Sequence, residues 1–136
     1  MGKLVRFSIS LDSDLLKGLD DLMAKSGYDN RSEAIRDLIR DRLVEGEWTD
    51  ENAETAAVLT IVYNHEAREI SDTLTRVQHE HYRLVVSTTH IHLDEHNCLE
   101  AIIMRGKSSL IRQTADELLW LRKVKHGKLI MTTTGK

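Results

Sequence analysis

Cysteine, long apolar runs and an excess of basic residues are scarce or missing in this 136-residue sequence, and each shortage excludes a class of protein. The single cysteine excludes an intramolecular disulfide and is typical of a reducing compartment, so we expect a cytoplasmic protein. No run of about 18 apolar residues is present, so we expect no membrane span, and residues 1–6 lack the apolar core of a signal peptide. The net charge of −3 provides no chain-wide basic surface for nucleic acid.

The residues that are present indicate a folded protein with one unusual cluster. Leucine, isoleucine, valine and phenylalanine make up about 27% of the chain, above the roughly 20% below which chains tend to remain disordered. The length allows one ordinary domain or two very small ones. Five of the seven histidines lie between residues 79 and 96, and the only cysteine follows at position 98. This cluster is the most informative feature of the composition.

Residues 1–45 have the pattern of a strand followed by two helices. Residues 5–11 alternate strictly between apolar and polar side chains, which predicts a half-buried strand. Two apolar stripes at helical spacing follow; Asp12 and Asn30 are predicted to begin the helices, and Gly27 to end the first. A lone strand has no partner in its own unit for its backbone donors and acceptors. We therefore expect two copies of this strand to pair in an obligate dimer.

Residues 46–55 are polar and acidic, and they are predicted to form a linker. Residues 56–136 then have the pattern βαββαβ, which is the ferredoxin-like split βαβ arrangement. We expect a mixed sheet with both helices on one face, and we expect Gly127 to end the second helix. The whole chain is therefore predicted to be an α+β protein with a βαα domain over residues 1–45 and this larger C-terminal domain. The predicted strands of the larger domain cover 56–63, 84–93, 98–105 and 128–133.

The histidine cluster has the spacing of a metal site on a β-hairpin. His90 and His92 are two residues apart, so they share one face of a strand at a spacing of roughly 6.6–7 Å. If residues 93–97 form a five-residue loop, His92 lies opposite Cys98. His90 then lies opposite Glu100, and all four side chains share that face. The other face of the hairpin is predicted to pack under the helices; it carries Ile91, Leu93, Leu99, Ala101 and Ile103.

Two imidazoles and a thiolate suit a borderline-soft transition metal. Because the helices are expected on the other face, the fourth ligand is predicted to be His79 or His81 of another subunit. Glu100 and Gln78 are predicted to support the ligands from outside the coordination shell. One cysteine with three histidines is not among the usual structural zinc sets. Square-planar, nitrogen-rich sites favour nickel or copper, and spacing alone leaves the metal open. The remaining histidines are interpreted as ordinary surface residues; they are His65, His96 and His126.

A catalytic zinc centre could be drawn from the same residues, with a carboxylate beside an open metal position. The chain offers no convincing nucleophile motif, however, and catalysis would leave the first 45 residues without a role. The sequence therefore favours a protein that is not an enzyme.

Two copies of the first strand, paired antiparallel, would form a ribbon that fits the major groove of B-DNA. Arg6, Ser8 and Ser10 would lie on the exposed face of this ribbon and contact base edges. Asn30 and Arg31, at the start of the second helix, would lie where a phosphate could bind. The N-terminal domain carries eight basic and nine acidic residues, so affinity for DNA must come from the local placement of its cations.

Two motifs together resemble a known family. The segments VRFSISLDSDLLKGLD and YDNRSEAIRDLIRDRL resemble a ribbon-helix-helix DNA-binding domain. The segment QHEHYRLVVSTTHIHLDEHNCLE resembles the metal-binding region of the nickel-responsive transcriptional regulators, the NikR family. The combination of His79, the HIH motif eleven residues later and Cys98 is highly specific. The ribbon-helix-helix pattern is shared by many repressors and antitoxins.

The resemblance implies a repressor in which nickel promotes binding to a palindromic operator in double-stranded DNA. It implies a homotetramer, a dimer of dimers with a core of ferredoxin-like (ACT-like) domains. One square-planar Ni(II) per subunit would be held by His90, His92 and Cys98. The fourth ligand would be His79 of another subunit.

The resemblance also extends outside the metal site. Arg6, Ser8 and Ser10 fall on the base-reading positions of the ribbon-helix-helix pattern. Glu33 and Asp37 match acidic residues of a second cation site in some relatives. The family often has a basic pair that contacts DNA near the start of the metal domain, and here Arg68 alone remains of it.

Other interpretations use the same motifs. A metal storage or trafficking protein would keep the metal site and show no salt-dependent DNA binding. A sensor of another transition metal would keep both halves. A ribbon-helix-helix antitoxin would need a toxin partner and would leave the histidines unexplained.

Overall fold

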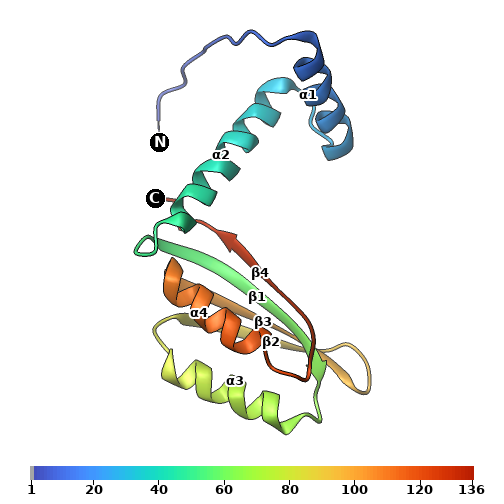
Figure 1. Cartoon of the computed structure of the whole chain (residues 1–136), viewed down its shortest axis with the longest axis vertical. Helices are drawn as coiled ribbons and strands as arrows, with labels where there is room; N and C mark the ends of the chain where they lie inside the picture. Colours follow the sequence, from blue (N-terminus) through green and yellow to red (C-terminus); the bar gives the residue numbers. More distant parts are fainter. Residues whose placement is uncertain (1) are drawn as a thin grey trace. The chain divides into compact units, whose positions relative to one another are not determined.

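The structure is a computed structural model that describes residues 2–136, and it contains two compact units that meet between Arg42 and Leu43 (Figure 1). Helices α1 (Ser13–Ser26) and α2 (Arg31–Thr49) follow an N-terminal segment. The second unit continues from the end of α2 through four strands and two helices. These are β1 (Glu54–Asn64), α3 (Arg68–Glu80), β2 (Val85–His92), β3 (Asn97–Lys107), α4 (Ser108–Leu119) and β4 (Val124–Thr132). Over the described residues, no helix has the length and apolar character needed to cross a bilayer.

Both ends of the first helix and the start of the second are set by the predicted residues. Asp12 accepts a hydrogen bond from the backbone N–H of Leu15 at 2.8 Å, and Asn30 does the same for Glu33 at 2.9 Å. Gly27 has φ 74° and ψ 24°, and its N–H donates to the Met23 carbonyl at 2.9 Å. A residue with a side chain adopts this left-handed conformation only at a cost, so glycine suits the end of the helix.

The predicted strand over residues 5–11 is not formed within the single chain: residues 2–12 have no regular secondary structure. The apolar side chains of this segment are largely exposed, with Val5 at 77%, Phe7 at 72% and Ile9 at 59%. A strand exists only when a neighbour accepts and donates its ladder hydrogen bonds, and the described residues of this unit form no other strand. The apolar alternation is therefore present without the partner that would make it a strand.

The predicted linker over residues 46–55 is largely structured. Helix α2 continues to Thr49, and β1 already begins at Glu54. Trp48 is only 3% exposed, and its indole N–H donates to the Thr132 carbonyl at 2.8 Å. The Arg112 guanidinium lies 5.4 Å from the Trp48 ring centroid, within the range of a cation–π contact. Burial of this one large apolar side chain fixes the last turn of α2 within the C-terminal unit, so these residues belong to the packed domain.

The second unit is a four-stranded sheet in the order β2-β3-β1-β4, with α3 and α4 on one face (Figure 1). All three neighbouring pairs are antiparallel, so the expected mixed sheet is wrong. The split βαβ arrangement explains why: β1 and β2 are joined by a helix, and β3 lies between them. The core between sheet and helices includes Leu59, Ile61, Ile70, Val77, Ile102, Met104, Ile111 and Leu118.

The face of the hairpin that packs under the helices is the opposite of the one predicted. Cys98, Glu100 and the next two alternate residues of β3 are buried, so they lie on the covered face. Ile103 is 41% exposed, and Ile91 is 47% exposed, because their side of the sheet has no cover within the described chain. Alternation determines which residues share a face, but it does not determine which face the helices cover.

The last helix ends earlier than predicted, and the last strand begins earlier. Helix α4 ends at Leu119, and Gly127 lies inside β4, opposite Ile61 of β1. A Cβ atom at position 127 would collide with the Leu119 side chain and lie 3.2 Å from Cγ2 of Ile61. Gly127 therefore serves the close approach of the α4 end to the sheet, and it does not end a helix.

Candidate metal centre and DNA-binding residues

The hairpin of β2 and β3 has the predicted register. His92 pairs with Cys98, and His90 pairs with Glu100. The turn is held by Asp94, whose Oδ1 accepts the backbone N–H groups of residues 96 and 97, each at 2.8 Å. The Asn97 side-chain amide also donates to Asp94, and together these bonds lower the pKa of its carboxyl to about 2. The Asp94 carboxylate thus stays ionised at neutral pH and holds the turn in place.

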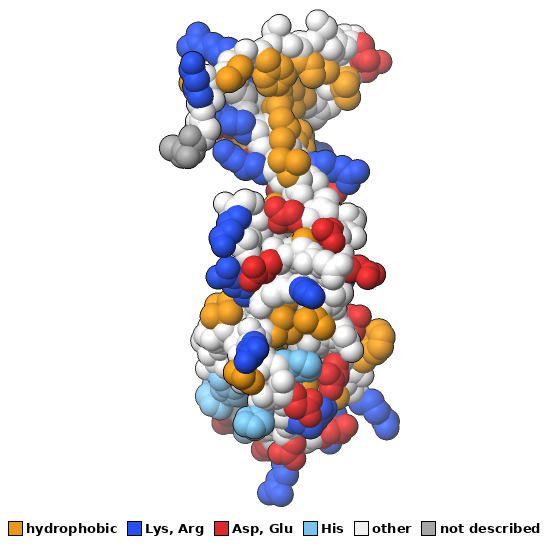
Figure 2. Space-filling model, turned by 90° about the vertical axis from the view of Figure 1, so that its left-hand side faces the viewer, with side chains coloured by type: hydrophobic (Ala, Val, Ile, Leu, Met, Phe, Trp, Pro, Cys, Tyr) orange, Lys and Arg blue, Asp and Glu red, His pale blue; other side chains and the backbone are white. Residues whose placement is uncertain are grey.

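Three donor groups of one chain converge beside this hairpin. Ligand atoms of His65, His92 and Cys98 all lie within 4.8 Å of one another, and the Cys98 Sγ lies 3.4 Å from Nδ1 of His92. His65 and His92 are in edge contact, with ring centroids 5.8 Å apart. Figure 2 shows histidine side chains (pale blue) grouped on the surface of the C-terminal unit. Two imidazoles and a thiol form a donor set that fits a borderline-soft transition metal.

His65 was predicted to be an ordinary surface residue, but it is one of the three converging donors. His65 follows the last residue of β1, and β1 pairs with β3 so that Tyr63 lies opposite Cys98. Nδ1 of His65 lies 3.0 Å from the His96 carbonyl. Since a carbonyl only accepts hydrogen bonds, Nδ1 carries the proton, and the Nε2 lone pair is left for another partner. The split βαβ topology was the signal, because it places the end of β1 beside the start of β3.

His90 belongs to a hydrogen-bonded network at the edge of this group. The Tyr63 hydroxyl donates to Oε2 of Glu100 at 2.8 Å, and His90 Nδ1 lies 3.2 Å from the same oxygen. The rings of His90 and His92 are in edge contact at 5.1 Å. Glu100 is only 7% exposed, and burial together with this carboxylate raises the pKa of Tyr63, which keeps its proton. Glu100, which was predicted to support the ligands, thus contacts His90, and Tyr63 was not predicted.

The thiol of Cys98 is protonated in the metal-free protein. Burial, and then the negative charges of Glu100 and Asp94, raise the pKa of Cys98 above its ordinary value. A metal ion would bring positive charge next to Cys98 and would displace the proton of its thiol.

His79 and Gln78 lie on the last turn of α3, away from the donor group. His79 is exposed, Gln78 is half-buried, and His79 is not among the three donors that converge within the described residues. His81 is the C-cap of the same helix. An exposed histidine at this helix end is accessible to a second molecule.

The predicted DNA-binding residues are exposed but differ in what they contact. Arg6, Ser8 and Ser10 lie on the unpaired N-terminal segment, and Arg68 is the exposed first residue of α3. Arg31 instead makes a two-pronged ion pair with Asp20 of α1, with Nε and Nη2 each 3.1 Å from a carboxylate oxygen. The hydrogen bonds from Arg31, and then its charge, lower the pKa of Asp20. The predicted phosphate contact is thus already occupied by a carboxylate.

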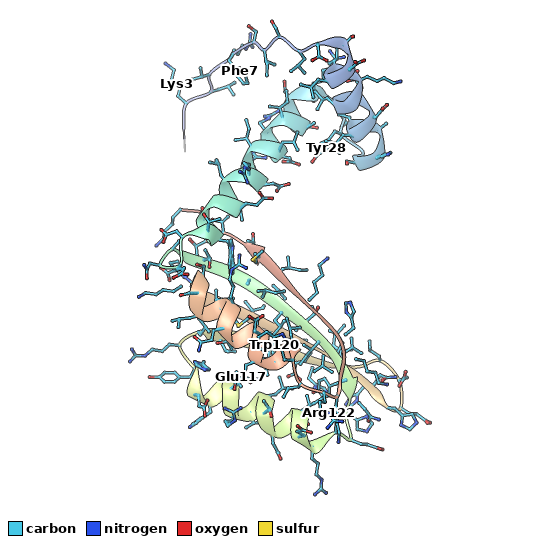
Figure 3. All side chains as sticks on the ribbon, viewed as in Figure 1. Lys3, Phe7, Tyr28, Glu117, Trp120 and Arg122 are labelled. Atoms are coloured by element: carbon cyan, nitrogen blue, oxygen red, sulfur yellow. The ribbon has the colours of Figure 1, made fainter. Side chains whose placement is uncertain are left out.

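The predicted second cation site is likewise partly occupied by protein groups. Asp37 accepts the Tyr28 hydroxyl at 2.7 Å and Arg40 at 3.1 Å, and these bonds lower the pKa of Asp37. Figure 3 shows Tyr28 in the turn that precedes α2. Glu33 is exposed on the first turn of α2, and it does not join Asp37 in a group of convergent donors within the described residues.

Comparison with known proteins matches each half of the chain separately. Residues 5–46 match the family model described as "Ribbon-helix-helix protein, copG family", and residues 56–132 match "NikR C terminal nickel binding domain". A DNA-binding module joined to a metal-binding module defines a class of protein, the metal-responsive transcription regulators, which are not enzymes. Within that class, the chain belongs to the NikR family of nickel-responsive regulators.

The relatives cover nearly the whole chain. A protein of Caldanaerobacter subterraneus subsp. tengcongensis, named "Putative nickel-responsive regulator", is 57% identical over 98% of this chain and 86% of its own length. A protein with the same name from Geobacter metallireducens is 53% identical over 100% of this chain and 98% of its own length. Another, from Pyrococcus horikoshii, is 51% identical over 98% of this chain and 97% of its own length. The structure of an uncharacterized protein from Thermotoga maritima has a similar fold, with a TM-score of 0.51 and 13% sequence identity. The match covers 57% of this chain and 96% of that protein.

Proposed function

We propose that this protein is a nickel-responsive repressor, in which Ni(II), one ion per subunit, promotes binding of the paired N-terminal segments to a palindromic operator in the cytoplasm. The observation that carries the proposal is the hairpin register, which sets the Cys98 Sγ 3.4 Å from the His92 imidazole beside His90. A fixed nitrogen and sulfur donor set of this kind binds late first-row metals more tightly than the hard cations Mg²⁺ and Ca²⁺.

Four residues would hold the nickel in this proposal. His90, His92 and Cys98 come from one subunit, and His79 comes from a second subunit. His79 is exposed on the last turn of α3, and this exposure supports the role because the imidazole is accessible to a second subunit. A ligand supplied by a second subunit would make metal binding and assembly mutually dependent. Glu100, with Tyr63, would hold the His90 ring in place.

The N-terminal segment would read the operator as a two-stranded ribbon. Val5, Phe7 and Ile9 are exposed in the single chain, and hydrophobic side chains (orange) gather over the N-terminal unit in Figure 2. Pairing with a second copy would bury them and satisfy the unpaired backbone groups of the segment. The alternate residues, Arg6, Ser8 and Ser10, would then face the base edges of the major groove. Asn30 and Arg68 would contact phosphates on either side.

The proposed homotetramer would form through an uncovered apolar face of the C-terminal sheet. The sheet face opposite α3 and α4, which we call the open face, has no cover within the described chain. It carries the half-buried or exposed side chains of Val58, Val62, Leu99, Ala101, Ile103 and Ile130. We propose that the open faces of two ribbon dimers pack together, so that one assembly presents two ribbons to the two half-sites of the palindrome.

The test measures DNA binding with and without Ni(II). An operator is first selected from a random duplex pool in the presence of the metal, and its affinity is then compared for the wild type, His79→Ala and His65→Ala. We expect nickel to tighten operator binding by about 5- to 150-fold in the wild type, the usual size of allosteric coupling. His79→Ala should abolish this effect, and His65→Ala should preserve most of it.

Each alternative has its own outcome in this experiment. A change of less than about twofold on adding nickel to the wild type contradicts the sensor. Metal binding without salt-dependent DNA binding would identify a storage or trafficking protein. Loss of the response in His65→Ala but not in His79→Ala would place the fourth ligand within the same chain. A stronger response to Co(II), Cu(II) or Zn(II) would identify a sensor of another metal.

A further inference from the structure

The ion pair between Arg31 and Asp20 connects the two helices of the N-terminal unit. The guanidinium uses two of its donors, Nε and Nη2, one for each carboxylate oxygen, and both distances are 3.1 Å. This fork-to-fork geometry adds both energy and geometric specificity to the ion pair. The two side chains remain 56% and 47% exposed, so the pair lies at the surface, where DNA can reach it.

The position of Arg31 explains why its partner matters. It is the first residue of α2, where the helix dipole favours an anion. Arg31 and Ser32 line the same groove as Arg6 and Ser10 of the predicted base-reading segment. In the unbound chain, however, the charge of Arg31 is cancelled at close range by Asp20.

The N-terminal unit has no net charge, so its attraction for DNA depends on where individual cations are placed. Residues 1–42 hold eight lysines and arginines and eight aspartates and glutamates. Sequence-independent DNA binding depends on cations that replace the counterions of phosphates. A cation that is already paired must give up or share its carboxylate before it contributes, because a phosphate and Asp20 repel each other at the same guanidinium.

We propose that Asp20 is a specificity-determining residue, which holds Arg31 back from phosphates and so suppresses binding to DNA that is not the operator. The inference rests on the proposed DNA-binding function. On random DNA, the few contacts formed do not compensate for loss of the Asp20 pair. On the operator, base contacts hold the N-terminus of α2 against the backbone long enough for a phosphate to replace the carboxylate. Asp20 thereby raises the ratio of specific to non-specific affinity, which is the quantity a regulator needs in a genome.

A neighbouring residue provides the matched control. Asp21 is the next residue of α1, it is also exposed, and it makes no ion pair among the described residues. Asp20→Asn and Asp21→Asn change the net charge of the chain by the same amount. Only the first releases Arg31. Arg31→Lys is an independent second variant, since a lysine keeps the charge but cannot form the two-pronged pair.

The experiment measures the affinity of full-length protein for a random-sequence duplex without nickel, over a series of salt concentrations. We expect Asp20→Asn to tighten this binding by about 3- to 10-fold and to steepen the salt dependence by about 0.9 for each Arg31 that gains a phosphate. Asp21→Asn should tighten it by less than about twofold. Arg31→Lys should act in the direction of Asp20→Asn, and Asp20→Asn in an Arg31→Gln background should match Asp21→Asn.

Two results would overturn the inference. Equal effects of Asp20→Asn and Asp21→Asn would show that only net charge matters. Weaker binding of Asp20→Asn to both random and nickel-selected duplexes, with an unchanged thermal midpoint, would show that Asp20 helps Arg31 to bind phosphate. The proposed function is judged separately, by the response of wild-type operator binding to nickel. A wild type without that response would refute the sensor, while the comparison on random DNA would still decide the role of Asp20.

Discussion

At the residue scale, the donor side chains are held in place before any metal arrives. The His65 ring is fixed through Nδ1 by the His96 carbonyl, and His90 is in contact with Glu100, which Tyr63 also binds. Such partners fix the tautomer and the direction of an imidazole lone pair, and for a metal ligand such as the proposed His90 their loss typically costs about 10- to 100-fold in metal affinity. The cost of ordering these rings is therefore met during folding and not during metal binding.

Nickel affinity should fall as the pH is lowered, because the Cys98 thiol must lose its proton. The pKa of Cys98 is raised by burial and by neighbouring carboxylates, so the thiol form dominates near neutral pH in the free protein. Metal binding should release this proton, and the apparent affinity should rise with pH up to the pKa of the thiol. Calorimetric titration in buffers of different ionisation enthalpy measures the released proton directly. An apparent affinity that stays constant across the neutral range would contradict the thiolate ligand.

At the element scale, the last turn of α2 depends on one side chain. Trp48→Ala removes a buried ring, its hydrogen bond to the end of β4 and the contact with Arg112. We expect a loss of about 3–5 kcal/mol in the free energy of unfolding, measured by chemical denaturation. Trp120 lies just after α4 and is 79% exposed, so Trp120→Ala is the matched control, with a change within about 0.5 kcal/mol (Figure 3). Similar losses in both variants would mean that Trp48 does not anchor the helix.

Features that depend on residues close in sequence could be predicted, whereas those that depend on distant contacts could not. The helix caps at Asp12, Gly27 and Asn30, and the pairing of His92 with Cys98, depend on nearest neighbours along the chain or across one turn. They could be predicted because the interactions that determine them are short in sequence. The end of α4 was misplaced because Gly127 looks like a helix stop, whereas its role is set by Leu119 and a distant strand.

The candidate site shows the same boundary. The pairing of His92 with Cys98 could be found from strand parity, whereas His90, predicted beside them, is not among the converging donors of the described chain and contacts Glu100. His65 could not be found in this way, since it joins His92 and Cys98 only through the pairing of β1 with β3 and a carbonyl contact 31 residues away. The covered face of the sheet was also wrong, because alternation is symmetric until tertiary packing chooses a side.

At the scale of the whole molecule, two apolar surfaces remain without cover in the single chain, the N-terminal segment and the open face. If the open face joins two dimers, a charge at its centre should separate them. Ile103 lies on the inner strand β3 and is 41% exposed. We expect Ile103→Glu to reduce the tetramer to dimers in analytical ultracentrifugation, because a carboxylate is costly to bury without a partner.

A charge elsewhere on the same unit provides the control. Leu110 is similarly exposed at 46%, but it lies on α4, on the other side of the sheet. Leu110→Glu should leave the mass of the assembly unchanged. A tetramer that survives Ile103→Glu, or one that dissociates in Leu110→Glu instead, would place the contact between dimers on another surface.

The opposite surroundings of the two tryptophans have a practical consequence for optical work on this chain. Trp48 is enclosed by the core, whereas the indole of Trp120 is surrounded by solvent. Their fluorescence should therefore differ in colour and in access to a dissolved quencher, with acrylamide dimming Trp120 first and leaving a bluer emission from Trp48. That residual blue signal comes from the last turn of α2 where it packs on the sheet, so the protein carries its own unlabelled reporter of this contact within the C-terminal unit.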